Sequence, residues 1–322
     1  MRAAVVGAGM AGAVLAVLLR QAGRDVRVFD KGRGTGGRLA TRRHESGARF
    51  DHGCPGIPIP AGDPLTTVLE TVIAQGSAAR WAGLGEAMAV GLPGMSQIPR
   101  ALLGPVTVTA SFEVARADRD SAGWRLVSRT GETTDPFDAL FLTVPAPQLV
   151  HLVESAAPRF AEAAAAAAYD PCWTLMLAFA PEAAATLAAT APGALDGEGV
   201  EIAIHDGGKP GREGAATLVC HMSAQWTRAN LEREREDVAA ELGSRIAGAL
   251  GLPAPTVAMA HRWRFARVAR ATVLAEPWDA DLSIGIAGDW TAGPDARDAF
   301  VSAVRCAGAA RPGTPEARRV PA

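Results

Sequence analysis

The sequence predicts an α/β fold with a mostly parallel sheet and an inserted α+β domain built on an antiparallel sheet. A short apolar run that borders glycine, such as residues 3–6, is typical of a buried parallel strand, and the segment 283–293 also begins as a buried strand that ends at Gly288. Apolar or β-branched runs bounded by glycine and proline also occur in the middle of the chain. These runs, TLMLAFA, VEIAIHD and ATLVCHMS, predict the strands of a second sheet.

Size and composition agree with this fold class. The chain has 322 residues, of which 48% are apolar, enough for one large or two medium domains. Its formal net charge is −2 and no basic domain stands out, so we expect no nucleic-acid partner.

The cysteines and histidines indicate neither a metal site nor a disulfide framework. The four cysteines form no CxxC pair, and the six histidines show no paired ligand spacing. We therefore expect no metal and a reducing, cytoplasmic location. Glycines interrupt the uncharged run from Ala3 to Leu19, and no other segment has the roughly 18 apolar residues of a membrane span, so we expect no membrane association.

The first glycine loop lies in a complete βαβ pattern. The strand-like AAVV is followed by GAGMAG, a helix-like segment, and a second strand that ends at Asp30, 18 residues beyond Gly12. In a Rossmann-like domain these glycines allow a tight turn and a close approach of pyrophosphate to the helix start, and the acidic residue binds a ribose hydroxyl. A chance glycine-rich helix start is the alternative. The expected dinucleotide contacts here are Gly7, Gly9, Met10, Ala11, Gly12 and Asp30.

A second glycine-rich loop, KGRGTGGRLATRR, follows at once and favours FAD over NAD, because the longer FAD must be threaded further across the sheet. Its residues resemble the GG-doublet signature of flavoproteins related to amine oxidases. The resemblance implies non-covalent FAD, whereas the alternative is a solvated Arg/Gly turn. Covalent attachment is not expected, because Cys306 lies in a helix-like run. The matching residues are Asp30, Lys31, Arg33, Gly36, Gly37, Arg38 and Thr41.

Two later segments extend this resemblance. After the expected hairpin at 106–132 and the strand and turn at 137–148, Val114 corresponds to the backbone edge that such proteins present to adenine. The segment SIGIAGDWTAG, residues 283–293, resembles the closing motif, in which Gly288 and Asp289 would reach the ribityl chain. The following helix would direct its N-terminus at the flavin. A common core strand with a turn aspartate is the alternative for this segment.

Four further segments resemble the renalases, especially the bacterial forms: 48–53, 93–102, 169–179 and 261–268. The first contains Asp51, which we count among the cofactor contacts. The sequence departs from renalases at Cys54, Pro55 and Gly56, where those proteins usually carry glutamine and an aromatic residue, and the segment 57–93 is short.

The renalase resemblance implies an FAD-dependent oxidase that converts 2- or 6-dihydro isomers of NAD(P)H to NAD(P)+. Hydride would pass to flavin N5, and O2 would reoxidise the flavin to give H2O2, so no protein acid or base is required. The candidates on the substrate side are His52, Pro55, Trp263, Arg264 and Trp290. Structural alternatives are core packing for the tryptophans, a turn-holding role for His52 and a salt bridge for Arg264.

Two other functions stay open. An FAD-dependent amine oxidase would need an aromatic cage and commonly a lysine near the flavin, but the chain has one tyrosine, Tyr169, and its two lysines, Lys31 and Lys209, lie in a nucleotide loop and a glycine-rich turn. A non-catalytic FAD-binding protein is the other alternative.

We expect the FAD domain to be discontinuous, comprising residues 1–60, 95–150 and 256–313. Residues 61–94 and 151–255 would form the substrate domain, with an amphipathic helix at 231–250. The Pro- and Arg-rich tail, 314–322, is predicted to be disordered.

Overall fold

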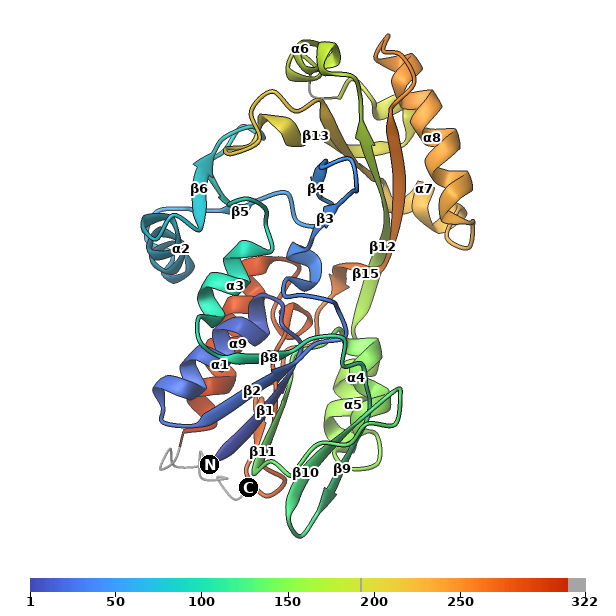
Figure 1. Ribbon diagram of the computed structural model, residues 1–322. Helices are drawn as coiled ribbons and strands as arrows, with labels where there is room; N and C mark the ends of the chain where they lie inside the picture. Colours follow the sequence, from blue (N-terminus) through green and yellow to red (C-terminus); the bar gives the residue numbers. More distant parts are fainter. Residues whose placement is uncertain (192, 312–322) are drawn as a thin grey trace. The chain divides into compact units, whose positions relative to one another are not determined.

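The computed structural model describes residues 1–191 and 193–311 of the chain (Figure 1). The described chain divides into two units. The first comprises residues 1–35, 102–168 and 270–311, and the second comprises 36–101 and 169–269. The first unit contains a mostly parallel sheet and the second contains antiparallel sheets, which confirms the predicted fold class.

The first unit is built on a six-stranded sheet whose central strands are buried on both faces. Each neighbouring pair is parallel except for the edge pair β16 and β17. The strand sequences AAVV and ALFL are fully apolar, as expected for strands buried on both faces. In sheet order the strands are β16 (Trp278–Asp279), β17 (Ile284–Ile286), β11 (Ala139–Leu142), β1 (Arg2–Val6), β2 (Asp25–Phe29) and β8 (Thr107–Thr109).

Helices α1 (Met10–Gln21) and α9 (Ala296–Ala309) pack against each other beside this sheet (Figure 1). Helix α9 begins with a capping box, in which Asp295 and Asp298 each accept a hydrogen bond from the other's backbone N–H, and this fixes where the helix starts. The unit also contains a hairpin and a helix pair, namely β9 (Val114–Asp120) with β10 (Gly123–Ser128), and α4 (Ala146–Val153) with α5 (Pro158–Ala165).

The second unit is built on a four-stranded antiparallel sheet that is covered on both faces. Helix α8 (Arg235–Ala249) packs Leu242 and Ile246 against Leu175 and Leu177 on one face. On the other face Phe50 belongs to a second apolar cluster, with Met176 and Val219. The strands in sheet order are β13 (Val200–His205), β14 (Thr217–Met222), β12 (Ala168–Ala178) and β15 (Val257–Arg270).

Smaller elements complete the second unit. The hairpin β3 (Thr41–Arg43) and β4 (Arg49–Asp51) follows the second glycine loop, and β4 supplies Phe50 to the apolar cluster. The other elements are β5 (Ile57–Pro58), β6 (Ala78–Trp81), β7 (Met88–Gly91), α2 (Pro64–Ala74), α6 (Ala184–Ala188) and α7 (Ala224–Ala229). Helix α3 (Gln97–Leu103) begins in the second unit, and its last two residues belong to the first.

The units do not follow the expected domain boundaries. Residues 36–60 and 256–269 pack with the second unit, whereas residues 151–168 pack with the first. The three predicted strands correspond to β12, β13 and β14, and the predicted helix at 231–250 is α8. The expected tail, 314–322, lies outside the described residues.

Gly12 sets how closely α1 approaches β1. A Cβ atom at this position would lie 1.9 Å from the Gly7 carbonyl oxygen, so Gly12→Ala must push the helix away from the sheet. We expect the free energy of unfolding to fall by about 1–3 kcal/mol, a typical cost of overpacking. Urea denaturation monitored by circular dichroism measures this change.

Gly308→Ala is the matched control, because Gly308 lies in α9 and its Cβ would meet no atom within 4 Å. This substitution should stabilise the protein by up to about 1 kcal/mol through helix propensity. Equal effects of the two substitutions would contradict the close-approach role of Gly12.

Candidate functional site

The first glycine loop is closed by steric contact and by one threonine. Gly7 has a φ of +109°, and a Cβ there would lie 2.6 Å from Thr143 Oγ1. The Thr143 hydroxyl donates a hydrogen bond to the Val6 carbonyl at 2.9 Å. Sequence reasoning missed Thr143, although a hydroxyl residue directly after the apolar run ALFL was the available signal. The loop is therefore fixed from the end of β11.

Asp30 ties the first glycine loop to the end of β2. One carboxylate oxygen accepts from the Ala8 N–H at 2.6 Å, and the other accepts from the Gly32 N–H at 2.7 Å. The Asp30 carbonyl accepts from the Phe112 N–H at 2.9 Å, which holds the segment leading to Val114 alongside. A carboxylate has about four acceptor positions, so Asp30 keeps capacity for a ribose hydroxyl.

The N-terminus of α1 suits a phosphate group. Gly9 caps the helix without a side-chain hydrogen bond, and Met10 and Ala11 are buried in the first turn. Unbonded first-turn N–H groups and the helix dipole together favour an anion at this end. The glycine-lined loop, the helix start and Asp30 thus fit a dinucleotide pyrophosphate and its ribose.

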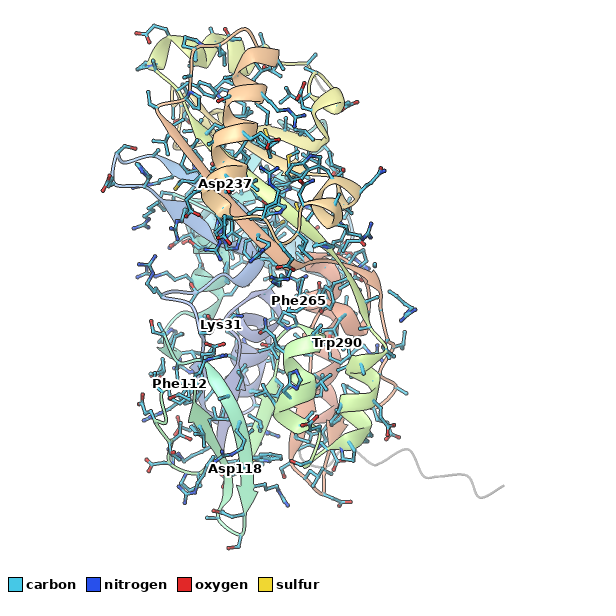
Figure 2. All side chains as sticks on the ribbon, turned by 90° about the vertical axis from the view of Figure 1, so that its right-hand side faces the viewer. Lys31, Phe112, Asp118, Asp237, Phe265 and Trp290 are labelled. Carbon is cyan, nitrogen blue, oxygen red and sulfur yellow. The ribbon has the colours of Figure 1, made fainter. Side chains whose placement is uncertain are left out.

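The C-terminal motif forms a buried turn on α9. The Gly288 N–H donates to Ser302 Oγ at 2.9 Å, and Asp289 is buried. Trp290, labelled in Figure 2, has no exposed surface, and its indole N–H donates to the Val144 carbonyl at 3.3 Å. The expectation that Trp290 faces the substrate stays a prediction, although the side chain is packed inside the first unit. It is a core residue of the first unit.

The second glycine loop makes a tight turn that its glycines permit. Gly36 and Gly37 have φ angles of +135° and +53°. The Arg38 carbonyl then accepts from the Cys54 N–H at 2.8 Å, and a Cβ on Gly53 would lie 2.0 Å from that carbonyl oxygen. The two turns are therefore in direct backbone contact.

The basic side chains of the second loop differ in environment. Lys31 and Arg33 are exposed in the first unit. Arg38 is partly buried in the second unit and donates to the Ala266 carbonyl at 3.2 Å.

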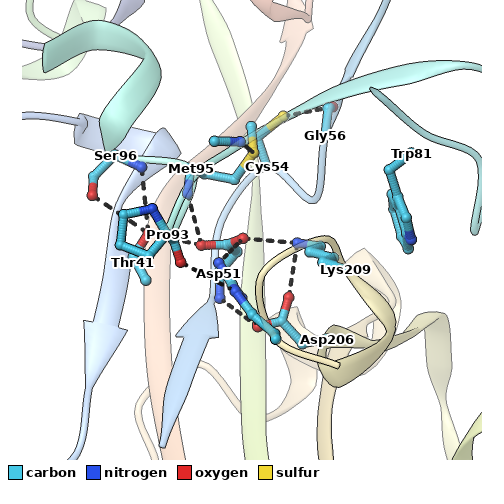
Figure 3. A network of polar contacts seen from close by, with 12 residues as sticks. Thr41, Asp51, Cys54, Gly56, Trp81, Pro93, Met95, Ser96, Asp206 and Lys209 are labelled. Atoms are coloured by element: carbon cyan, nitrogen blue, oxygen red, sulfur yellow. Dashed lines mark hydrogen bonds and ion pairs between the residues drawn. The ribbon is translucent and has the colours of Figure 1, made fainter. Parts of the chain in front are cut away.

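Four charged side chains form a buried cluster in the second unit (Figure 3). Lys209 Nζ lies 2.9 Å from Asp51 Oδ2 and 2.8 Å from Asp206 Oδ1. Arg212 pairs with both carboxylates, at 2.7 Å to Asp51 Oδ2. The spacing of Asp206, Lys209 and Arg212 was the available sequence signal, and sequence reasoning missed it.

Within this buried charge cluster, every part of the Asp51 carboxylate has a donor. Oδ1 accepts from the Met95 N–H at 3.0 Å and from the Thr41 hydroxyl at 2.7 Å (Figure 3). Burial alone would raise the pKa of Asp51, but Lys209 and Arg212 hold this pKa below its ordinary value. The Asp51 side chain is thus engaged inside the protein and fixes the end of β4 directly before His52, and its expected cofactor contact stays a prediction.

Three of the candidate substrate residues, His52, Pro55 and Trp263, lie close to one another in the second unit. His52 stacks on Trp263 with ring centroids 5.1 Å apart, and the Trp263 indole N–H donates to the His52 carbonyl at 2.8 Å. His261 meets both rings edge-on, at 4.9 Å and 4.4 Å. Pro55 is half-buried in the following turn.

Arg264 points away from that group. Side chains alternate between the two faces of a strand, so Trp263 and its neighbour Arg264 lie on opposite faces of β15. Arg264 is exposed and pairs with Glu232 through two contacts at 2.8 Å and 2.7 Å. In the structure Arg264 is engaged in a surface ion pair, and its expected substrate role stays a prediction.

The buried histidines are uncharged near neutral pH. Burial, with a smaller effect of Arg42, lowers the pKa of His52 to about 4. Burial likewise lowers the pKa of His221 to about 4 and that of His261 to about 3. These rings can donate and accept hydrogen bonds without carrying charge.

The cysteines are protonated thiols in separate places. Burial raises the pKa of Cys54, that of Cys172 to about 11, and those of Cys220 and Cys306 to about 12. Among the described residues all four are free thiols, and no group of His, Cys, Asp and Glu side chains is arranged to hold a metal ion.

The parallel sheet with its glycine loop is a Rossmann-like dinucleotide-binding fold, and the second unit adds antiparallel sheets to it. Residues 5–70 match the family of NAD(P)-binding Rossmann-like domains. The structure is similar to the crystal structure of a protein provisionally named protoporphyrinogen oxidase from Exiguobacterium sp. 255-15, with a TM-score of 0.69 and 12% sequence identity. That match covers 94% of this chain and 96% of the other. In the part of the chain that the structure describes, no helix combines the length and apolarity of a membrane span.

The buried charge cluster should be intolerant of losing one cation. Lys209→Met leaves Asp51 and Asp206 with Arg212 as their remaining cationic partner, and we expect the free energy of unfolding to fall by about 3–5 kcal/mol. Chemical denaturation measures the loss. Arg264→Ala, which removes an exposed ion pair, should change stability little. Similar losses for both variants would contradict the special role of the cluster.

His52 should make the protein sensitive to acid. Its folded pKa of about 4 lies below the ordinary 6.5, so the unfolded chain binds a proton more readily. Stability should therefore fall as the pH drops from about 6.5 towards 4, by roughly 1.4 kcal/mol per pH unit for a fully shifted group. His52→Gln should flatten this slope in urea titrations across that range. The exposed His151→Gln should not.

Proposed function

We propose that the protein is an FAD-dependent oxidoreductase of the renalase type. The proposed reaction oxidises 2- or 6-dihydro isomers of NAD(P)H to NAD(P)+, with O2 as the final acceptor and H2O2 as its product. The observation that carries the proposal is the cradle in the first unit, where Gly7, Gly12 and Thr143 close a loop at an uncapped helix start and Asp30 borders it.

FAD is favoured over NAD as the resident dinucleotide by the second glycine loop. In the first unit the pyrophosphate and adenosine would be held by Gly7, Gly9, Gly12 and Asp30, with Gly288 and Asp289 at the ribityl chain. Bound FAD would supply the hydride acceptor, N5, because no side chain in this protein can accept a hydride.

The side chains would then serve to bind and orient. Oxidation of a dihydronicotinamide yields an aromatic ring without a proton transfer, so the reaction requires no catalytic acid or base. This matches the side chains near His52, because the Asp51 carboxylate is held by Lys209 and Arg212 and the pKa of His52 is about 4. Placement of the substrate is the contribution expected of His52 and Trp263.

An amine oxidase agrees less well with the second unit. Lys209, one of the two lysines, is held between two buried carboxylates. Tyr169, the single tyrosine, packs edge-on against Phe265 at 5.6 Å. Neither residue is arranged as the lysine or the aromatic cage of such an enzyme. A non-catalytic FAD-binding protein is the remaining alternative.

The purified protein should be yellow and should release FAD on denaturation. Borohydride-treated NAD+, which contains the 2- and 6-dihydro isomers, should bleach the flavin in the absence of air. Amines and protoporphyrinogen should not. Bleaching by an amine or by protoporphyrinogen instead would replace the proposed substrate class, and a flavin that none of them reduces would favour the non-catalytic alternative. Protein that stays colourless after reconstitution would contradict the cofactor.

Asp30→Ala should weaken FAD binding about 10- to 100-fold. The estimate follows from losing a charged acceptor worth about 1.5–3 kcal/mol. Fluorescence titration of apoprotein with FAD measures the dissociation constant. Asp25→Asn, an exposed position at the other end of β2, is the control and should leave the constant unchanged. An unchanged constant for Asp30→Ala would remove Asp30 from the site.

A further inference from the structure

One face of the second unit's sheet changes from apolar to imidazole-rich along its length. Phe50 and Val219 belong to the apolar cluster on this face. Because side chains alternate along a strand, His221 continues the face two residues beyond Val219. His52 lies two residues beyond Phe50, and its contacts with His261 and Trp263 place it at the same end. The imidazole patch is defined here as His52, His221, His261 and Trp263.

Two nitrogens of the imidazole patch lack partners. Within the described residues, His52 Nδ1 and His221 Nε2 are buried and make no hydrogen bond of ordinary distance and angle, although the backbone carbonyls of Phe50 and Ala40 lie near the His52 ring. Leaving a buried polar atom unpaired costs about 1–3 kcal/mol, so two such atoms in one patch indicate that something outside the chain bonds to them. A neutral imidazole presents one donor and one acceptor nitrogen. The patch thus offers hydrogen bonds of both kinds.

The charges around the imidazole patch are largely compensated. Arg42, which acts on His52 and His261, and Arg235, which acts on His261, are exposed to solvent, where their charges are screened. Near His221, Lys209 pairs with Asp51 and Asp206, while Arg267 pairs with Glu201 at 2.9 Å. A buried anion beside His221 would lose its hydration without gaining an unpaired cation, because both nearby cations already have carboxylate partners. The free-energy cost of desolvation would be much smaller for a neutral polar group.

We propose that His52 and His221 bind the neutral carboxamide of an aromatic or dihydroaromatic substrate whose ring packs on the imidazole patch. A carboxamide has a C=O acceptor and an NH2 donor, which match the two kinds of imidazole nitrogen. The identification with the carboxamide of a dihydronicotinamide rests on the proposed function. The patch is a specificity element in this proposal and performs no proton transfer.

Two ligands of nearly equal shape test the proposal. Benzamide carries the neutral carboxamide, whereas benzoate replaces it with a carboxylate. Isothermal titration calorimetry of the protein as purified, with its cofactor bound, measures both affinities at neutral pH. We expect benzamide to bind at least about 10-fold more tightly than benzoate.

Variants identify the residues involved. His221→Phe keeps a ring but removes the hydrogen bond, and should weaken benzamide about 3- to 10-fold, the effect of losing about 0.5–1.5 kcal/mol. His221→Gln, which keeps a donor and an acceptor, should recover most of that loss. His151→Phe, at an exposed position in the first unit, is the control and should change nothing.

The outcomes separate this inference from the proposed function. Benzamide binding that depends on His221 supports the inference even where no dihydronicotinamide reduces the flavin, which would reject the function alone. Reduction that is unaffected by His221→Phe, with unchanged benzamide affinity, would retain the function and reject the inference. If benzamide does not bind, or binds no more tightly than benzoate, the inference is rejected. Water would then be the partner of these nitrogens.

Discussion

The arrangement of the second unit depends on the burial of two carboxylates together with two cations. Removing such groups from water is costly, and the cost is offset only while each charge keeps its partners. Asp51, Asp206, Lys209 and Arg212 come from two segments that are distant in sequence, and Asp51 also accepts from the backbone of Met95. A shift of either segment would leave a buried charge unpaired. The turn that carries His52 therefore has little freedom to move.

The first unit achieves a fixed loop by a different physical means. Its glycine loop contains no buried charge pair, and steric contact decides its shape. Side chains are excluded at Gly7 and Gly12, and the Thr143 hydroxyl bonds the strand end beneath them. Within this loop the Gly7 N–H donates to the Phe29 carbonyl and the Ala8 N–H to Asp30, whereas the helix start that follows has no side-chain cap, which suits a phosphate. In the charge cluster, in contrast, the polar groups that are held in place already have partners inside the protein.

The local patterns of the chain made much of the fold predictable. The strand, loop and helix around Gly7 and the helix now seen as α8 follow from periodicity and glycine spacing. Long-range pairing was not accessible in this way. No local sequence pattern shows that Asp51 forms an ion pair with Lys209, or that Trp290 is buried in a core. That Trp263 and Arg264 lie on opposite faces of the strand could be predicted, since side chains alternate along a strand once β15 is assigned. The alanine run at 163–168 favours a helix by propensity, yet the chain enters β12 at Ala168.

The raised pKa values of the thiols affect how well such a protein resists oxidation during turnover. Peroxide attacks the thiolate rather than the thiol, and its attack can end in irreversible sulfur oxidation. Burial raises the pKa of every cysteine in this chain, so almost no thiolate exists at neutral pH. If turnover releases hydrogen peroxide as proposed, the catalyst would be chemically resistant to its own product, and its lifetime in use would be limited by methionine damage or loss of cofactor.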